Sequence, residues 1–207
     1  MLFRSLITDM DQPLGRMAGN SLEIIECIDI LNGKGPSDLR DLCLELAAWM
    51  FYLGGRAASV AEGKKLASEM IASGRARDKF REIIRLQGGD HQVVDDPSRL
   101  PHAHHSVDVP STSDGFLAGM NCEQLGTACV VLGGGREKKD DSIDHAVGLV
   151  FHKKAGDRAK RGETLCTIHY NSEERLGRAR PLIEQAYRIE NEPPRTLPKL
   201  IQRVIGE

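Results

Sequence analysis

One stretch near the start of the chain predicts the fold, and it reads Ile7-Thr8-Asp9-Met10-Asp11-Gln12-Pro13-Leu14-Gly15-Arg16-Met17-Ala18-Gly19-Asn20. The pattern indicates the end of a strand, a Pro-Leu-Gly turn and the capped start of a helix. Loops that leave a strand and open a helix carry ligands in α/β enzymes. Few residues precede this strand, whereas a parallel strand needs sheet neighbours that bury both of its faces. We therefore expect the chain to be the second half of a larger protein.

The composition is that of a globular protein without a strong charge bias. The 207 residues include 28 Lys and Arg against 30 Asp and Glu, with 40% hydrophobic and only 4% aromatic residues. The charge balance lacks the excess of basic residues that is typical of nucleic-acid-binding proteins. The low aromatic content predicts a mainly aliphatic core. The apolar runs are too short to span a bilayer, and Asp9 and Asp11 interrupt any targeting peptide. We expect a cytoplasmic protein without nucleic-acid or membrane partners.

The cysteines are five in number and form no Cys-x-x-Cys pair. They are Cys27, Cys43, Cys122, Cys129 and Cys166. Cys27, Cys43 and Cys129 lie among apolar residues at helical spacing. We interpret them as reduced, buried thiols of a cytosolic protein, and no electropositive setting favours a catalytic cysteine.

Residues 1–100 are expected to be mostly helical. Apolar residues repeat at steps of three and four in several segments that capping residues open and glycines close. The expected helices run from Asn20 or Ser21 to about Leu31, from Ser37 or Asp38 to Leu53, from a Ser59–Glu62 capping box to Gly74, and through Phe80–Leu86. Gly and Pro then bound a hinge over residues 88–101.

Beyond residue 100 the period changes, and we expect an α+β domain over residues 101–207. The expected strands cover residues 106–109, 115–119, 148–151 and 164–169. The expected helices cover residues 121–132, 172–189 and 196–205. The fold class is thus α/β (α+β), with a helical segment over residues 1–100 followed by this domain.

Glycine-rich turns in the second part resemble the strand-turn-strand units of biotinyl and lipoyl carrier domains. The resemblance lies in Asp114-Gly115-Phe116 and in the segment His152–Leu165, which contains Gly156-Asp157 and Gly162. A carrier needs a lysine in the hairpin after the final strand, and Ile168–Ser172 has none. The pattern therefore predicts a barrel-sandwich shape without a covalently attached cofactor.

Two other motifs offer possible ligand sites. His102, His104 and His105 place imidazoles close together, but no Cys or Glu completes a zinc spacing, so a solvated strand start is favoured. Gly133-Gly134-Gly135-Arg136 is either an anion-binding loop or a flexible charged surface loop. Because it follows a helix rather than opening one, its spacing alone favours the surface loop.

The Pro-Leu-Gly turn suggests a cation site. A turn that exposes the carbonyls of Leu14 and Met17, followed by a helix with Glu26, supplies the oxygen ligands that hard cations prefer. A solvated Glu26 on an open helix face is the alternative, and spacing alone favours it.

Several motifs together resemble the pyrimidine-nucleoside phosphorylases, which include the thymidine phosphorylases. The matching segments are the opening stretch through Asn20 with Ser21-Leu22-Glu23 and Glu26, Leu31-x-Gly33-x-Gly35-Pro36-x-Asp38-Leu39, Gln87-Gly88-Gly89-Asp90, Val94-x-Asp96-Pro97-x-x-Leu100-Pro101, Leu132-Gly133-Gly134-Gly135-Arg136, Ile143-Asp144-x-x-Val147-Gly148 and Gly156-Asp157. The resemblance runs in order over essentially the whole chain and covers only the C-terminal half of these enzymes.

The resemblance implies a reaction and its cofactors. The family splits pyrimidine nucleosides with phosphate as co-substrate, giving a free base and a pentose 1-phosphate, without an organic cofactor. The enzymes are homodimers whose cleft closes between a helical and an α/β domain. The loop that holds phosphate, the residues that grip the base and the dimer helices all lie upstream of the matching half. The resemblance therefore assigns no catalytic residue to this chain.

A few site residues carry over. The resemblance implies that the carbonyls of Leu14 and Met17 and the carboxylate of Glu26 belong to a site for a potassium-like monovalent cation. It assigns Gly134, Gly135 and Arg136 to a substrate-binding loop at the cleft, contrary to the surface-loop interpretation. It places Phe3 near a base-contacting position, through a poor local match.

We therefore expect the C-terminal part of a pyrimidine-nucleoside phosphorylase, a pentosyltransferase of nucleoside salvage, that is inactive by itself. The alternative is a non-catalytic module that complements a separate N-terminal half or serves as a scaffold.

Overall fold

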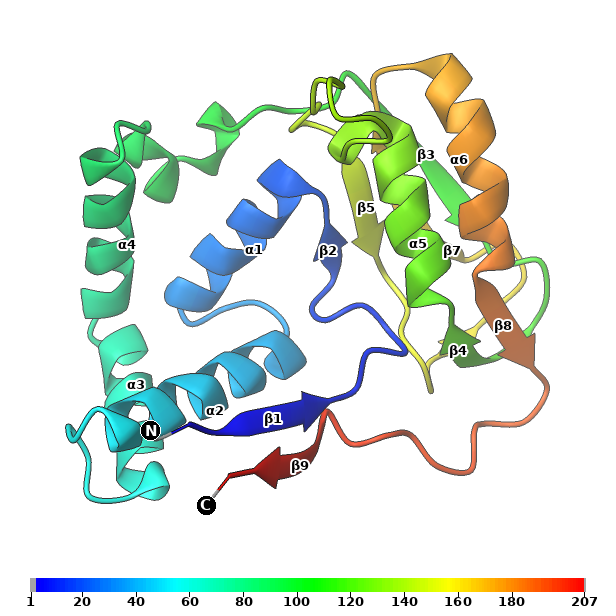
Figure 1. Cartoon of the computed structure of the whole chain (residues 1–207). Coiled ribbons are helices and arrows are strands. Elements are labelled where there is room, and N and C mark those ends of the chain that lie inside the picture. Colours follow the sequence, from blue (N-terminus) through cyan, green and yellow to red (C-terminus); the bar gives the residue numbers. More distant parts are fainter. Residues whose placement is uncertain (1–2, 207) are drawn as a thin grey trace. The chain divides into compact units, whose positions relative to one another are not determined.

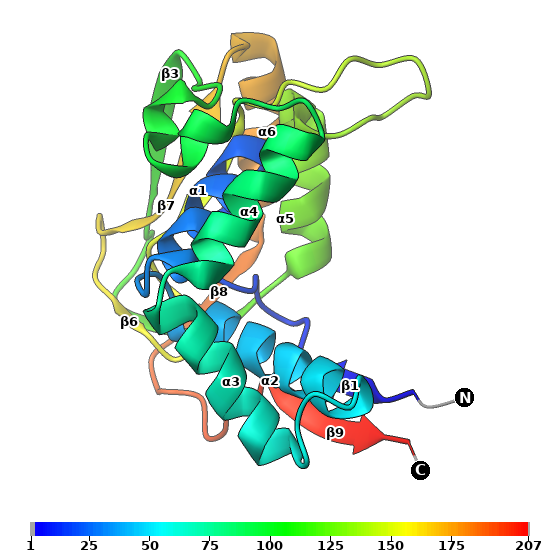
Figure 2. The same cartoon turned by 90° about the vertical axis from the view of Figure 1, so that its left-hand side faces the viewer.

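The structure, a computed structural model, describes residues 3–206. The chain forms two compact units (Figures 1 and 2). Unit 1 contains Ile25–Arg99 together with the residues before Met10 and those after Leu197, and unit 2 contains Met10–Ile24 and Leu100–Leu197. The chain therefore passes between the units not only at Arg99 but also at three other points.

Unit 1 is built from helices and one pair of strands. The helix α1 (Asn20–Leu31) enters it from unit 2, and α2 (Ser37–Leu53), α3 (Val60–Ala72) and α4 (Arg75–Leu86) follow. Two short 3₁₀ turns cover His91–Val94 and Pro97–Arg99. The strands β1 (Ser5–Thr8) and β9 (Ile201–Ile205) pair antiparallel, with Ser5 opposite Ile205 (Figure 1).

The helix α3 shows both how a helix of unit 1 is capped and how it packs against its neighbour. The expected box at α3 forms in part, because the Glu62 N–H donates to Ser59 Oγ at 3.2 Å while Ala58 N–H donates to the Glu62 carboxylate at 2.7 Å. At the crossing of α2 and α3, a Cβ on Gly63 would lie 2.5 Å from the Ala48 carbonyl oxygen. Small residues thus let these two helix backbones approach closely.

The C-terminal segment of unit 1 corrects one prediction. A helix over residues 196–205 is wrong, since Ile201–Ile205 is the strand β9. The apolar residues Leu197, Leu200, Ile201 and Val204 have a spacing that imitates a helix. However, β-branched side chains favour a strand once a partner is present, and β1 supplies that partner from the opposite end of the chain. The first strand, β1, pairs antiparallel with this segment.

Unit 2 holds two further sheets and two helices. A four-stranded antiparallel sheet has the order β2-β5-β7-β3, and a three-stranded sheet has the order β6-β4-β8. The strands are β2 (Met17–Ala18), β3 (His105–Pro110), β4 (Gly115–Met120), β5 (Gly148–Phe151), β6 (Arg158–Ala159), β7 (Thr164–Tyr170) and β8 (Tyr187–Glu190). The helices are α5 (Cys122–Cys129) and α6 (Glu173–Gln185), which lie side by side in Figure 1.

One hydrophobic core joins both sheets of unit 2 to its helices. It contains Leu117 from β4, Leu149 from β5, Ile168 from β7, Ala128 from α5 and Ile183 from α6, each less than 1% exposed. Alternation along β5 and β7 places these side chains on the inner face. The expected α/β (α+β) class is confirmed. The helix predicted over residues 172–189 ends earlier, at Gln185, because Tyr187–Glu190 pairs with β4 as β8.

Two glycines bring the start of α1 against β5. A Cβ on Gly148 would lie 2.2 Å from the Ala18 carbonyl oxygen, and one on Gly19 would lie 2.5 Å from the Val147 carbonyl oxygen. Gly19 also has a φ of 133°, a backbone conformation that residues with a side chain rarely adopt. Any side chain at either position would push the β2–α1 connection away from the sheet.

We expect the Gly148→Ala variant to lose about 1–3 kcal/mol of unfolding free energy, since the added methyl group would collide with the backbone of Ala18 and Gly19 and with the Leu22 side chain. Gly126→Ala is the matched control, because Gly126 is an exposed position of α5 with nothing within 4 Å of an added Cβ. There the helix propensity of Ala predicts a gain of up to about 1 kcal/mol. Urea titrations that place both variants at equal stability would contradict this account of the contact.

Candidate functional site

A lysine side chain holds the Pro-Leu-Gly turn. Lys154 Nζ donates to the carbonyl oxygens of Pro13, at 2.5 Å, and Gly15, at 2.8 Å. The backbone N–H of Ala155 donates to Gln12 Oε1 at 3.3 Å. Hydrogen bonds from an ammonium group are stronger than neutral ones. Two carbonyls of the turn are therefore bound to a cation that belongs to the chain itself.

The residues after the turn are fixed to strand β5. Arg16 Nη1 donates to the His152 carbonyl oxygen at 2.9 Å, and Phe151 N–H donates to the Arg16 carbonyl oxygen at 2.7 Å. In β2, Met17 lies opposite Val150. The turn thus has a defined position over the edge of the four-stranded sheet.

The start of α1 contacts the glycine loop that follows α5. Asn20 Nδ2 donates to the Gly134 carbonyl oxygen at 2.9 Å. The predicted helix over residues 121–132 ends at Cys129 and continues as a π-helical turn over Val130–Gly134. Gly133 there has a φ of 110°, a conformation that only glycine adopts without strain.

A network of polar side chains fixes the same loop from the other side. The Asp144 N–H donates to the Gly133 carbonyl oxygen at 2.8 Å, and the Asp144 carboxylate accepts from Asn171 Nδ2 at 2.8 Å. A Cβ on Gly133 would lie 2.4 Å from Arg175 Nη1, so this guanidinium lies directly over the glycine. The start of the loop is therefore anchored, contrary to the interpretation as a freely flexible surface loop.

The charged part of the loop has contacts of its own. The Asp141 carboxylate accepts from the N–H groups of Glu137, at 3.1 Å, and Lys138, at 2.8 Å. Arg178 forms an ion pair with Glu137 at 2.7 Å. Arg136 is exposed at the point where the chain leaves the glycines.

The other predicted site residues lie in both units. Leu14, in the turn, and Met17, in β2, belong to unit 2, whereas Glu26 of α1 belongs to unit 1, so their joint cation site remains a prediction. The interpretation of Glu26 as a solvated side chain is wrong, since it is 4% exposed. Phe3 belongs to unit 1 and is 55% exposed.

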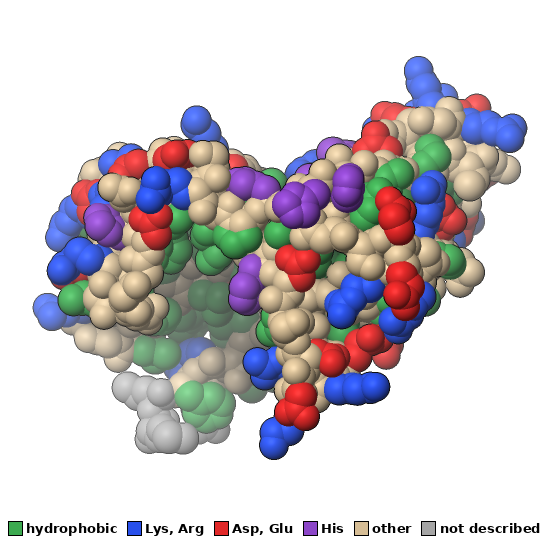
Figure 3. All heavy atoms as spheres, turned by 90° about the horizontal axis from the view of Figure 1, so that it is seen from above, with side chains coloured by type: hydrophobic (Ala, Val, Ile, Leu, Met, Phe, Trp, Pro, Cys, Tyr) green, Lys and Arg blue, Asp and Glu red, His purple; other side chains and the backbone are tan. Residues whose placement is uncertain are grey.

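Possible metal ligands on the described surface do not cluster. Figure 3 shows histidine side chains gathered on one face, where acidic and basic side chains are interspersed. Within residues 3–206, no three His, Cys, Asp or Glu side chains are placed so that they could hold a metal ion. Over the same residues, no helix has the length and hydropathy needed to cross a membrane.

The cysteines differ from the prediction. None of the five forms a disulfide in the described part of the chain, but Cys27 and Cys43 are exposed rather than buried. Cys166 is buried, and burial raises its pKa to about 11 and that of Cys129 to about 12. Apolar spacing on a helix had predicted burial, and it could not show that the faces carrying Cys27 and Cys43 are open.

Comparison with known families and proteins agrees with this architecture. Residues 3–77 match the glycosyl transferase family a/b domain, which gives the class of protein. Residues 116–190 match the pyrimidine nucleoside phosphorylase C-terminal domain. The pyrimidine-nucleoside phosphorylase of Staphylococcus haemolyticus is 43% identical over 203 residues, covering 98% of this chain and 46% of the relative. That of Geobacillus stearothermophilus is 44% identical over 170 residues, covering 82% of this chain and 39% of the relative.

The chain belongs to the pyrimidine-nucleoside phosphorylase family. It spans less than half the length of these curated relatives.

Removing the Lys154 ammonium should weaken the turn. We expect Lys154→Met to lower the unfolding free energy by about 2 kcal/mol, because two carbonyls lose a charged donor. Lys138→Met is the control, since Lys138 is an exposed residue of the charged loop and its substitution should change the unfolding free energy by less than about 0.5 kcal/mol. Guanidinium titrations of both variants measure the difference, and equal losses would show that the turn does not depend on Lys154.

Removing the Asn20 amide should loosen the glycine loop. We expect Asn20→Ala to speed hydrogen exchange at the Asp144 amide about fivefold, as one neutral hydrogen bond of about 1 kcal/mol is lost. Asn32→Ala is the control, because Asn32 accepts from Arg77 within unit 1. Unchanged exchange at Asp144 in the Asn20 variant would exclude this contact as the anchor.

Proposed function

We propose that the chain supplies the supporting half of a pyrimidine-nucleoside phosphorylase. The reaction is the reversible conversion of a pyrimidine nucleoside and phosphate into the free base and a pentose 1-phosphate. One observation carries the proposal: the Asn20 amide ties the segment after the Pro-Leu-Gly turn to the Gly134 carbonyl. Two motifs of the family resemblance that are far apart in sequence are thus held together within one unit.

The exposed Arg136 and the glycine backbone give this loop a role in binding. An arginine can hold phosphate or a sugar phosphate through two parallel hydrogen bonds. The preceding Gly133 and Gly134 carbonyls are already bound by Asp144 and Asn20, so the glycines position Arg136 without competing for the ligand. We assign Gly134, Gly135 and Arg136 to the cleft side that closes over substrate.

The reacting groups themselves are assigned to the region of the relatives that this chain does not match. In this proposal that region holds phosphate and the base, and the present chain contributes no residue that touches the reacting atoms. Catalysis of this type rests on positioning and on electrostatic stabilisation of the transition state. The 207-residue chain is therefore inactive by itself.

The proposal also includes a bound cation, the oligomeric state of the enzyme and its cellular compartment. The Leu14 and Met17 carbonyls and the Glu26 carboxylate contribute to a potassium-like site, for which the low exposure of Glu26 is support. The complete enzyme is a homodimer. The lack of disulfides among residues 3–206 suits a reducing cytoplasm.

We expect no phosphate-dependent release of uracil or thymine from uridine or thymidine by the purified chain. Adding the unmatched N-terminal part of the Staphylococcus haemolyticus enzyme as a second polypeptide should restore release, measured by chromatography of the base. Activity of the chain alone would overturn the division of roles. A stable complex without activity would favour the non-catalytic scaffold instead.

A further inference from the structure

One polar side chain of unit 2 lies where three segments of the chain meet. The Asn171 amide, between β7 and α6, accepts from the His104 backbone N–H at 2.7 Å and donates to the Asp144 carboxylate at 2.8 Å. Both ends of the amide are therefore used, one toward the start of β3 and the other toward the end of the charged loop. Asn171 is half-buried, so leaving either partner unbonded costs free energy.

Asp144 closes the neck of the loop over residues 133–144, which Figure 2 shows extending from the end of α5. The Asp144 backbone N–H donates to the Gly133 carbonyl oxygen at 2.8 Å and so brings the two ends of the loop together. The Asp144 carboxylate is fixed by two donors, the Asn171 amide and the Ala146 N–H at 3.0 Å. Asn171 thus holds the residue that closes the loop.

Other contacts of this loop do not replace the neck. The Asn20 amide binds the Gly134 carbonyl, so it fixes the entry of the loop and not its exit. The ion pair between Arg178 and Glu137 joins two exposed side chains, and exposed pairs of this kind contribute little. The exit of the loop therefore depends on Asp144.

We propose that Asn171 is a positioning residue for the phosphorylase reaction: through Asp144 it closes the neck of the loop and so sets where Arg136 meets phosphate. The role of Arg136 rests on the proposed function. Asn171 acts through Asp144 and does not itself contact substrate. Because a misplacement of about 1 Å can cost roughly 100-fold in rate, a hydrogen bond outside the site can control binding within it.

The junction requires one donor and one acceptor at position 171, and this requirement can be tested by exchanging them. Asn171→Asp keeps an acceptor for the His104 N–H but turns a second carboxylate oxygen toward the Asp144 carboxylate, and like charges at this distance repel. Combining Asn171→Asp with Asp144→Asn reverses the bond, so that position 144 donates and position 171 accepts. The Ala146 N–H keeps an oxygen acceptor in the double variant. Every group then has a partner again, and the neck should close.

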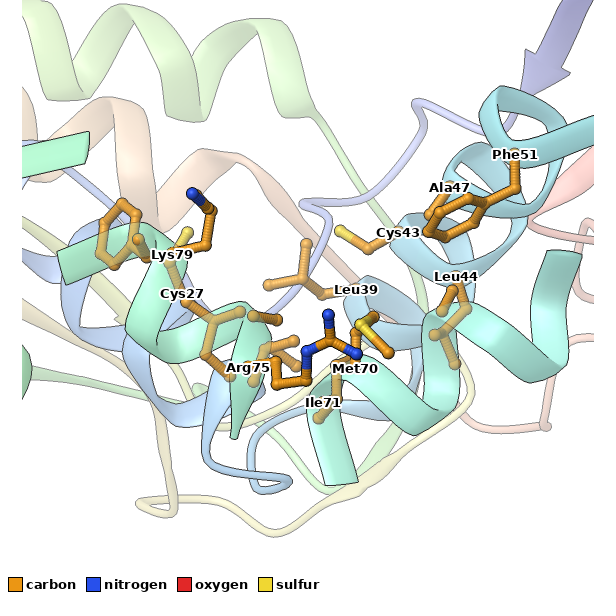
Figure 4. Close-up of a pocket in the computed structure, with 15 residues that line it drawn as sticks. Cys27, Leu39, Cys43, Leu44, Ala47, Phe51, Met70, Ile71, Arg75 and Lys79 are labelled. Atoms are coloured by element: carbon orange, nitrogen blue, oxygen red, sulfur yellow. The ribbon is translucent and has the colours of Figure 1, made fainter. Parts of the chain in front are cut away.

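The first experiment measures hydrogen exchange of the chain at the backbone amide of residue 144, corrected for its intrinsic rate. We expect Asn171→Asp to speed this exchange about tenfold and the double variant to return it to within about twofold of the unchanged chain. Amides of α2, whose side chains line an apolar pocket of unit 1 (Figure 4), serve as the internal reference because no residue of the junction belongs to that unit. Equal exchange in the single and double variants would overturn the proposal.

Asn121→Asp is the matched control, because it makes the same chemical change elsewhere in unit 2. Asn121 caps α5 by accepting from the Gln124 N–H at 3.0 Å, and aspartate caps helices equally well. Exchange at residue 144 should not change in this variant. A rise equal to that of Asn171→Asp would assign the effect to added charge alone and overturn the proposal.

The second experiment measures base release by the chain together with the N-terminal part of the Staphylococcus haemolyticus enzyme. We expect Asn171→Asp to raise KM for phosphate about fivefold with kcat within about twofold, because a binding group and not a reacting group is displaced. The double variant should restore KM. A merely structural role would instead lower kcat at unchanged KM, through loss of folded protein, and that result would overturn the proposal.

The two proposals fail in different ways. Base release with the same KM for phosphate in the unchanged chain and both variants would leave the phosphorylase role intact and refute the positioning role of Asn171. Absence of base release from the unchanged chain with its partner would refute the phosphorylase role and, with it, a positioning role in that reaction, whatever the exchange rates show.

Discussion

The close approach of two backbones at Gly19 and Gly148 is the constraint on which the candidate site depends. With no side chain between them, the entry to α1 lies against β5. This approach allows Met17 and Ala18 to pair with β5, and it brings Asn20 within reach of the Gly134 carbonyl. The turn, the helix start and the glycine loop therefore form one structure whose spacing is set by the absence of two methyl groups.

The two units differ in how completely they bury their own apolar surface. Unit 2 closes a core between two sheets and two helices, and its polar loops are bound by side chains such as Asp144 and Lys154. Unit 1 has helices of ordinary length but leaves a pocket of about 610 Å³ open. This contrast agrees with matches to family relatives of which the chain covers less than half.

Local sequence signals predicted most elements well. The helix over Ser37–Leu53 and the strand over Gly148–Phe151 have the predicted bounds, because apolar periodicity and flanking glycines determine both. The strand β9 was mistaken for a helix, since its partner lies at the other end of the chain. Long-range pairing overrides local spacing in such segments.

The site residues show the same limit. The glycine loop and the turn were identified from motifs, whereas the hydrogen bonds of Lys154 to the turn and the burial of Glu26 depend on tertiary contacts. No local signal separates Lys154 from the neighbouring Lys153. The sequence thus located the candidate loops, and only the fold revealed what holds them.

The pairing of β1 with β9 has a consequence for any shortened form of this polypeptide. In the described part of the chain, each of these strands has the other as its sheet neighbour. Proteolytic clipping of the tail would strip Ser5–Thr8 of its ladder and leave a bare edge, which invites aggregation. Each of these two strands therefore stabilises the other, so that loss of β9 would also destabilise β1.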